Sequence, residues 1–120
     1  MSNDNTVNGF DLYQHFDKSI YFTVRNPSNE VNVLACPFGP ERLNKWNHIV
    51  VTSENGLLKL YINNSLIGSK SGSSGVASTF KLGAGFEPSA NNNVFNGYLD
   101  DIRIYNRVLR EQEILTLYKE

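Results

Sequence analysis

Hydrophobic and polar residues alternate with a period of two along much of the chain, which is the pattern of strands with one buried face. The clearest run is Ile-Tyr-Phe-Thr-Val-Arg at 20–25. It ends at Asn26-Pro27, because a residue that precedes proline avoids helical backbone angles. A less regular run follows at 31–35, before the Pro-Phe-Gly-Pro sequence of 37–40. The pattern therefore predicts strands at 20–25 and 31–35, and a rigid loop at 37–40.

The strongest pattern lies between residues 43 and 68, where it predicts a three-stranded meander. A run rich in β-branched residues at 46–53 is followed by Asn55-Gly56, and these two residues tolerate the positive φ angles of a type I′ hairpin turn. The return run at 57–62 places leucine and isoleucine on one face, and Asn63-Asn64 predicts a second tight turn. A further short strand begins directly after that turn.

Turn-forming residues dominate the following part of the chain. The Gly/Ser-rich stretch 68–78 predicts a loop without structure of its own. Residues 80–86 predict a short strand, and the asparagine-rich stretch 87–93 predicts an exposed loop. Alternation returns at 98–105, where it predicts the last strand.

Helical spacing occurs at the C-terminus, where Ile114, Leu117 and Tyr118 fall at i, i+3 and i+4. Glu111 and Glu113 stand in the first turn, where the helix dipole favours acidic residues. One short helix after about seven short strands is typical of an all-β sandwich or jelly roll.

Composition narrows the function classes. A chain of 120 residues fits a single domain, residues 1–120, and its net charge of −1 offers no electrostatic footprint for nucleic acid or an anionic membrane. No run approaches the roughly 20 apolar residues that insertion into a membrane requires. The single Cys36 excludes an internal disulfide, and residues 1–10 lack the basic and apolar regions of a signal peptide.

Several blocks resemble the laminin-G-like, concanavalin A-like jelly rolls. WNHIVVT at 46–52 and GLLKLYIN at 56–63 resemble the central hairpin of that family, and KLG at 81–83 resembles a later strand. FNGYLDDIRIYNRVL at 95–109 matches its closing strand, and the residues at 113–118 match the helix that follows. The resemblance implies an antiparallel jelly-roll sandwich with one short C-terminal helix.

The chain departs from the family pattern at its beginning. The family opens with a Phe-Asp-Gly strand and a Trp-bearing strand, and neither is present here. Asn64 also stands where glycine is usual, and Arg110 where a serine or threonine would cap the helix. We therefore expect a fragment of a larger protein or a subunit whose sheet a partner chain or oligomer completes, while a natural minimal version is a third alternative. Residues 1–6 are expected to be flexible.

The resemblance also implies one structural calcium ion. Asp100 alternates with Ile102 and Ile104, so we expect its carboxylate on the core face, where it needs a partner. In the family the matching aspartate often helps to hold calcium, and Asp101 and Asn96 are further candidate ligands. The alternative is an aspartate that supports a turn through hydrogen bonds.

Sugar-binding jelly rolls stack aromatic rings on sugars and use amide side chains for the hydroxyl groups. The candidate loop residues are Phe38, Phe86, Asn91, Asn92 and Asn93. Tyr13 or Tyr61 is a candidate on a sheet face, whereas Trp46 matches a family core position. For each loop residue the alternative is a solvated loop or a partly buried ring.

Catalytic chemistry is not expected. His15 and His48 stand alone in the sequence, and alternation places Asp100 and Asp101 on opposite faces, so paired carboxylates are absent from the pattern. We therefore expect a non-catalytic recognition module that binds glycans. The alternative is a structural or adhesion component that packs against protein partners. In both cases the resemblance implies an extracellular, cell-surface or virion-associated location.

Overall fold

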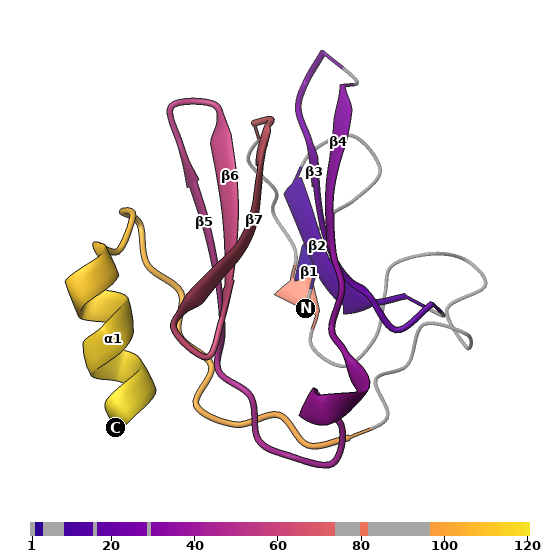
Figure 1. The fold of residues 1–120 in the computed structure, drawn as a ribbon. Helices are drawn as coiled ribbons and strands as arrows, with labels where there is room; N and C mark the ends of the chain where they lie inside the picture. Colours follow the sequence, from indigo (N-terminus) through magenta and orange to yellow (C-terminus); the bar gives the residue numbers. More distant parts are fainter. Residues whose placement is uncertain (1, 4–8, 16, 29, 74–79, 82–96) are drawn as a thin grey trace.

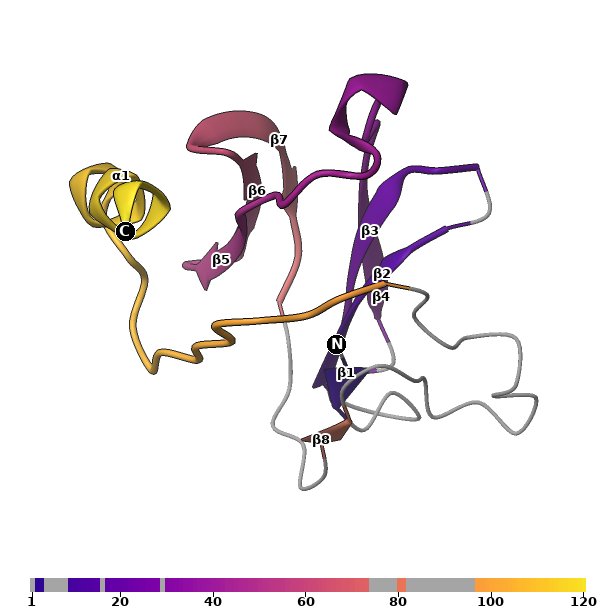
Figure 2. The ribbon, with the colours of Figure 1, turned by 90° about the horizontal axis from the view of Figure 1, so that it is seen from below.

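Two antiparallel sheets and a C-terminal helix form three layers in the computed structural model of the chain (Figures 1 and 2). The structure describes residues 2–3, 9–15, 17–28, 30–73, 80–81 and 97–120. Its elements are β1 (Ser2–Asn3), β2 (Gly9–Gln14), β3 (Ile20–Arg25), β4 (Val31–Cys36), a 3-10 turn (Pro40–Arg42), β5 (Ile49–Glu54), β6 (Leu57–Ile62), β7 (Ser65–Ser71), β8 (Phe80–Lys81) and α1 (Glu111–Lys119).

One sheet has five strands in the order β4-β3-β2-β1-β8, and the other has three in the order β5-β6-β7. All pairings are antiparallel. The architecture confirms the all-β sandwich with one short C-terminal helix that the sequence predicts. Part of the segment 1–6, Ser2–Asn3, pairs with both β2 and β8, while residues 1 and 4–6 lie outside the described residues.

The hydrophobic core lies between the two sheets. Alternate side chains of β3, β4 and β6 point into it and are almost fully buried. The buried members are Ile20, Phe22, Val24, Leu34, Cys36, Phe38, Leu58, Leu60 and Ile62. Burial also raises the pKa of the Cys36 thiol, because the thiolate is poorly solvated there.

The two predicted tight turns are present. Asn55 and Gly56 have φ angles of 50° and 75°, and Asn63 and Asn64 have φ angles of 51° and 68°. The Asn63 side chain also accepts a hydrogen bond from the backbone N–H of His48 at 2.9 Å. That bond connects the start of β5 to the end of β6, so the second turn also aligns the hairpin.

The C-terminal helix covers the outer face of the three-stranded sheet. Ile114 is fully buried in a second cluster with Tyr61 and Leu109, and Val50 and Leu117 pack against it. This arrangement confirms the predicted helix, although Arg110 at its N-cap makes no side-chain capping bond. No helix among the described residues is long and apolar enough to cross a membrane.

The predicted last strand is not formed. Residues 98–105 make no ladder with any described strand, and each of them is exposed. Asp101 has a φ angle of 53°, in the left-handed region, which a regular strand does not contain. The prediction that Asp100 faces the core beside Ile102 and Ile104 is therefore wrong: all three are exposed.

Three further details differ from the sequence-based predictions. Residues 68–71 belong to β7, where they pair with the start of β6, although the prediction assigned them to a loop. Trp46, expected in the core, is 69% exposed because it lies in the connection that precedes β5. Strand β2 was not predicted, although Phe10 and Leu12 alternate in sequence and pack against the core.

Candidate functional site

A row of side chains crosses the outer face of the five-stranded sheet. Tyr13 of β2 lies directly opposite Tyr21 of β3, and Tyr21 lies directly opposite Ala35 of β4. Their neighbours Ile20 and Phe22 point into the core, so the row points away from it. Tyr13 is 41% exposed and Ala35 is also exposed, which leaves the row open beside the Tyr21 ring.

The aromatic rings of this row lie close together. The Tyr13 and Tyr21 ring centroids are 5.5 Å apart, with 41° between the ring planes. His15 stacks on Tyr21 with centroids 4.5 Å apart and planes 11° apart. Tyr13, His15 and Tyr21 thus form one aromatic cluster, which we call the aromatic platform.

A carboxylate stands beside the aromatic platform. Asp17 lies in the turn between β2 and β3, where one carboxylate oxygen accepts a hydrogen bond from the backbone N–H of Ser19 at 2.9 Å. The other oxygen accepts a hydrogen bond from the Tyr21 hydroxyl at 3.4 Å, and His15 Nδ1 lies 3.5 Å from the carboxylate. Lys18 closes this turn with a φ angle of 72°.

The electrostatics follow from these contacts. The Ser19 N–H lowers the pKa of Asp17, and the nearby His15 adds to the effect, so the carboxylate stays ionised. Partial burial and the Asp17 charge raise the pKa of Tyr21, so its hydroxyl keeps its proton. The platform therefore presents the exposed Tyr13 ring and an oriented anionic acceptor on one surface.

The sequence identified only part of this site. Tyr13 was a candidate, but Tyr21, His15 and Asp17 were not. Their contact depends on the β2–β3 register, which pairs Tyr13 with Tyr21. The alternation at 10–13 was the signal that could have revealed β2. A strand there forms a tight hairpin with the strand at 20–25, which brings Tyr13 beside Tyr21.

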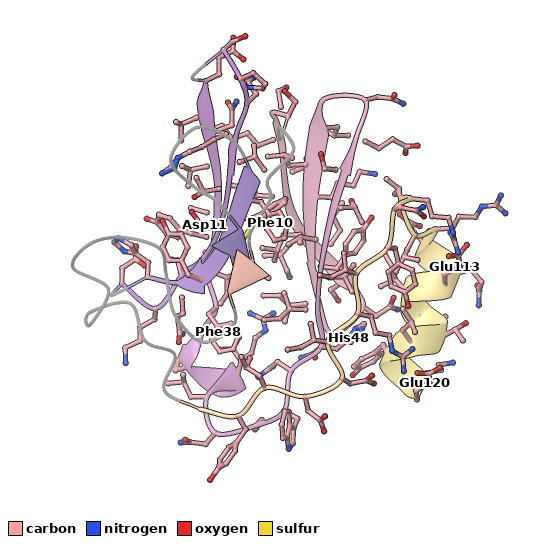
Figure 3. The ribbon with its side chains drawn as sticks, turned by 180° about the vertical axis from the view of Figure 1, so that it is seen from behind. Phe10, Asp11, Phe38, His48, Glu113 and Glu120 are labelled. Carbon is pink, nitrogen blue, oxygen red and sulfur yellow. The ribbon has the colours of Figure 1, made fainter. Side chains whose placement is uncertain are left out.

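Two other candidate aromatic residues are buried. Phe38 is 9% exposed and belongs to the core cluster, and it lies away from the helix-covered face (Figure 3). Tyr61 is 6% exposed because α1 covers it. Neither ring is available to stack on a ligand, so these two candidates do not belong to a sugar site. Phe86, Asn91, Asn92 and Asn93 lie outside the described residues.

The proposed calcium ligands do not come together in the described residues. The Asp101 carboxylate is paired with the Arg103 guanidinium, with Nε–Oδ1 at 3.0 Å, and Asp100 accepts a hydrogen bond from the backbone N–H of Asp101. No group of three acidic, histidine or cysteine side chains suited to a metal ion occurs among the described residues, and Asn96 lies outside them. Arg103 neutralises Asp101 in this structure, and the calcium site stays a prediction.

A groove of about 520 Å³ lies on the helix side of the three-stranded sheet. It is lined by Thr52, Glu54, Leu57, Lys59 and Tyr61 and by residues 107–111. Its lining has two acidic side chains and three basic ones, and its one aromatic ring is buried. The groove lacks the exposed rings that distinguish the aromatic platform.

His48 lies at the edge of the three-stranded sheet, near the C-terminal helix (Figure 3). Its ring centroid is 6.0 Å from that of Tyr118, and its Nδ1 has no hydrogen-bond partner among the described residues. Burial lowers the pKa of His48, because the charged form is poorly solvated there.

Comparisons with known proteins agree with this architecture. The model of a family described as the concanavalin A-like lectin/glucanases superfamily matches residues 1–115. A crystal structure of an S-layer domain-containing protein from Clostridium thermocellum is similar, with a TM-score of 0.57 and 22% sequence identity. That match covers 97% of this chain and 59% of the other, so this chain spans less than two thirds of it. No curated protein sequence matches the chain.

Proposed function

Since the chain belongs to the concanavalin A-like lectin/glucanase superfamily, we propose that it is a non-catalytic module that binds glycans on the aromatic platform. The observation that carries this proposal is the exposed Tyr13 ring beside the half-buried Tyr21 ring, with His15 stacked on Tyr21. We expect the chain to bind its ligand through this platform at a cell surface or outside the cell. The S-layer domain-containing protein of similar fold supports that location.

Stacking supplies the apolar part of recognition. The face of an aromatic ring is electron-rich, and the C–H groups of a pyranose face carry partial positive charge. The exposed Tyr13 ring and the Tyr21 ring, with centroids 5.5 Å apart, place two aromatic groups within reach of one ligand. The small side chain of Ala35 leaves room for a ligand beside Tyr21.

Asp17 supplies the polar part. An ionised carboxylate accepts hydrogen bonds from sugar hydroxyls, and a charged acceptor strengthens such bonds. The Ser19 N–H holds the Asp17 carboxylate in place at the rim of the platform, so a sugar would meet an oriented acceptor. A module of this kind binds weakly and gains avidity when several copies are displayed.

A glycan microarray followed by titration calorimetry with the oligosaccharides that bind tests this proposal. We expect Tyr13→Ala and Tyr21→Ala each to weaken binding by at least about tenfold, which is 1.4 kcal/mol. Tyr13→Phe should bind as the wild type does, because it keeps the ring. Tyr118→Ala is the matched control, since Tyr118 is an exposed tyrosine on α1.

Two outcomes would contradict the proposal. Failure of the folded wild-type chain to bind any oligosaccharide on the array would overturn glycan binding. Binding that persists in both alanine variants would overturn the aromatic platform as its site. Asp17→Asn separates the two contributions, because it keeps the shape of the turn and removes only the charge.

A further inference from the structure

Residues 98–105 carry backbone groups and apolar side chains that the described part of the chain leaves uncovered. No backbone hydrogen bond joins this segment to another described element. Tyr98 is 86% exposed and Ile104 is 65% exposed. The segment runs across the underside of the sheets toward α1 (Figure 2). Unpaired N–H and C=O groups in a row are a template on which a second strand can add.

A second copy of the same segment is an occupant that geometry constrains tightly. Two identical antiparallel strands in one sheet are related by a two-fold axis perpendicular to that sheet. Such an axis keeps every side chain on its own face, so the pair must be centred on a residue and never between two residues. Only a few registers are therefore available to a symmetric pair.

The charges of the segment narrow the choice among these registers. A pair centred on Asp101 places Asp101 opposite Asp101 of the second copy, and a pair centred on Arg103 opposes two arginines. Like charges directly opposite each other destabilise a sheet. A pair centred on Ile102 instead places Asp101 opposite Arg103 of the second copy, and the symmetry repeats this contact.

Two apolar contacts fit the same register. A centre at Ile102 opposes the two Ile102 side chains and places Leu99 opposite Tyr105 of the second copy, while Asp100 lies opposite Ile104. Within one chain, Arg103 already pairs with Asp101 at 3.0 Å, and both side chains are exposed. The same two charges can therefore exchange an intrachain contact for an interchain one. Pairing also moves Asp101 out of its left-handed φ of 53°.

We propose that two copies of this chain pair antiparallel through residues 98–105, with the two-fold axis at Ile102. The proposal does not rest on glycan binding, because the aromatic platform lies on the five-stranded sheet and the paired segment leads into α1. A homodimer of this kind presents two platforms, which makes its avidity for a repeating surface higher than that of one chain.

Charge-exchange variants test the pairing by light scattering across a concentration series. The wild type should be a dimer at high concentration. Asp101→Arg opposes two arginines and Arg103→Asp opposes two aspartates, so each variant alone should raise the dissociation constant at least about tenfold. An equimolar mixture of the two variants should dimerise again, because each arginine then meets an aspartate. The double variant should dimerise as well.

The control variant is Arg107→Asp, which makes the same charge change just outside the paired segment. Arg107 pairs with Glu113 at 2.8 Å, and its replacement should leave the dimer intact. A wild type that stays monomeric, or a mixture that stays monomeric, would overturn the proposal. Dimers of Arg103→Asp as tight as those of the wild type would overturn the register.

A cross-link keeps the proposal testable if the charge variants fail to fold. Ile102→Cys places two thiols at the two-fold axis, and oxidation should give a covalent dimer. Ser69→Cys is the control, because Ser69 is exposed on β7, and it should give little covalent dimer. Cys36 is buried and should not react. Equal cross-linking of the two variants would overturn the pairing.

Discussion

The β5–β6 hairpin and residues 98–105 contain similar alternations of apolar and polar residues, yet they have opposite environments. Leu58, Leu60 and Ile62 of β6 are almost fully buried against the five-stranded sheet, and β6 is paired on both edges. Ile102 and Ile104 have no such opposing surface among the described residues and are exposed. The comparison shows that alternation becomes a buried strand only where backbone partners and an apolar face are both within reach.

The local backbone separates the two regions as well. In the hairpin, the left-handed residues are Asn55 and Gly56, at the turn where the chain must reverse. In the segment 98–105, the left-handed residue is Asp101, in the middle of the alternation. Positive φ angles therefore complete a strand pair in the first region, whereas a single one interrupts the alternating run in the second.

The largest expected effect is the loss of a core side chain from the hairpin. Leu60→Ala should destabilise the chain by about 2–5 kcal/mol, because it leaves a cavity between the sheets. Ile104→Ala is the matched variant in the exposed segment and should change stability by less than about 0.5 kcal/mol. Urea unfolding at low protein concentration measures both. Equal effects would mean that residue 104 is buried in solution.

A smaller effect is expected at the hairpin turn. Gly56 has a φ angle of 75°, and a Cβ at this position meets no other atom within 4 Å, so the strain is in the backbone alone. Gly56→Val should cost about 1–2 kcal/mol, whereas Gly56→Asn should cost much less, because asparagine tolerates this region. Thermal unfolding of both variants gives the difference. A valine variant as stable as the wild type would contradict the type of turn.

Stability should also depend on pH through His48, which lies just before β5 and within the electrostatic influence of Asp101 and Arg103. Burial lowers the pKa of His48 below its usual value of 6.5, so the unfolded chain binds the extra proton more readily. The contribution of neutral His48 to the stability of the fold is complete above pH 6.5 and is lost as the pH falls below that value. The melting temperature of the wild type should fall from pH 7 to pH 5 more than that of His48→Gln. Parallel curves would show that His48 titrates normally.

The smallest effect on stability is expected at the ion pairs of Arg103, one of which joins residues 98–105 to the end of α1. Arg103 pairs with Asp101 and with Glu120, each at 3.0 Å, and all three side chains are well exposed. Arg103→Ala should therefore cost less than about 1 kcal/mol, and added salt should shrink the difference. Urea unfolding at low and high salt measures it. A larger, salt-independent loss would show that Arg103 is packed rather than merely paired.

Much of the fold was predictable where a local signal and the buried pattern agreed. The turns at Asn55-Gly56 and Asn63-Asn64 and the helix at 111–119 follow from φ preferences and from helical spacing. The segment 98–105 was mispredicted because alternation does not report whether a neighbouring edge is available. Trp46 was mispredicted because family position was used in place of burial.

The candidate site was less predictable than the fold. Tyr13 was recognisable as a sheet-face aromatic, but the sequence does not show that Phe38 is buried in the core or that α1 covers Tyr61. Asp17 joined the site through a turn whose residues have no distinctive pattern. Such contacts depend on strand register and on the packing of α1, and neither is a local property.

The sequence by itself determined the strand class, the two tight turns, the terminal helix and the family, because period, φ preference and motif spacing are carried by neighbouring residues. Only the tertiary structure decided which alternating runs are buried and which aromatic rings are open. The physical reason is that burial and backbone pairing require a second surface, and the chain must fold before that surface exists. Folding brings Tyr13 against Tyr21, and the proposed recognition depends on that contact. Folding also leaves residues 98–105 exposed, and the proposed self-pairing depends on that exposure.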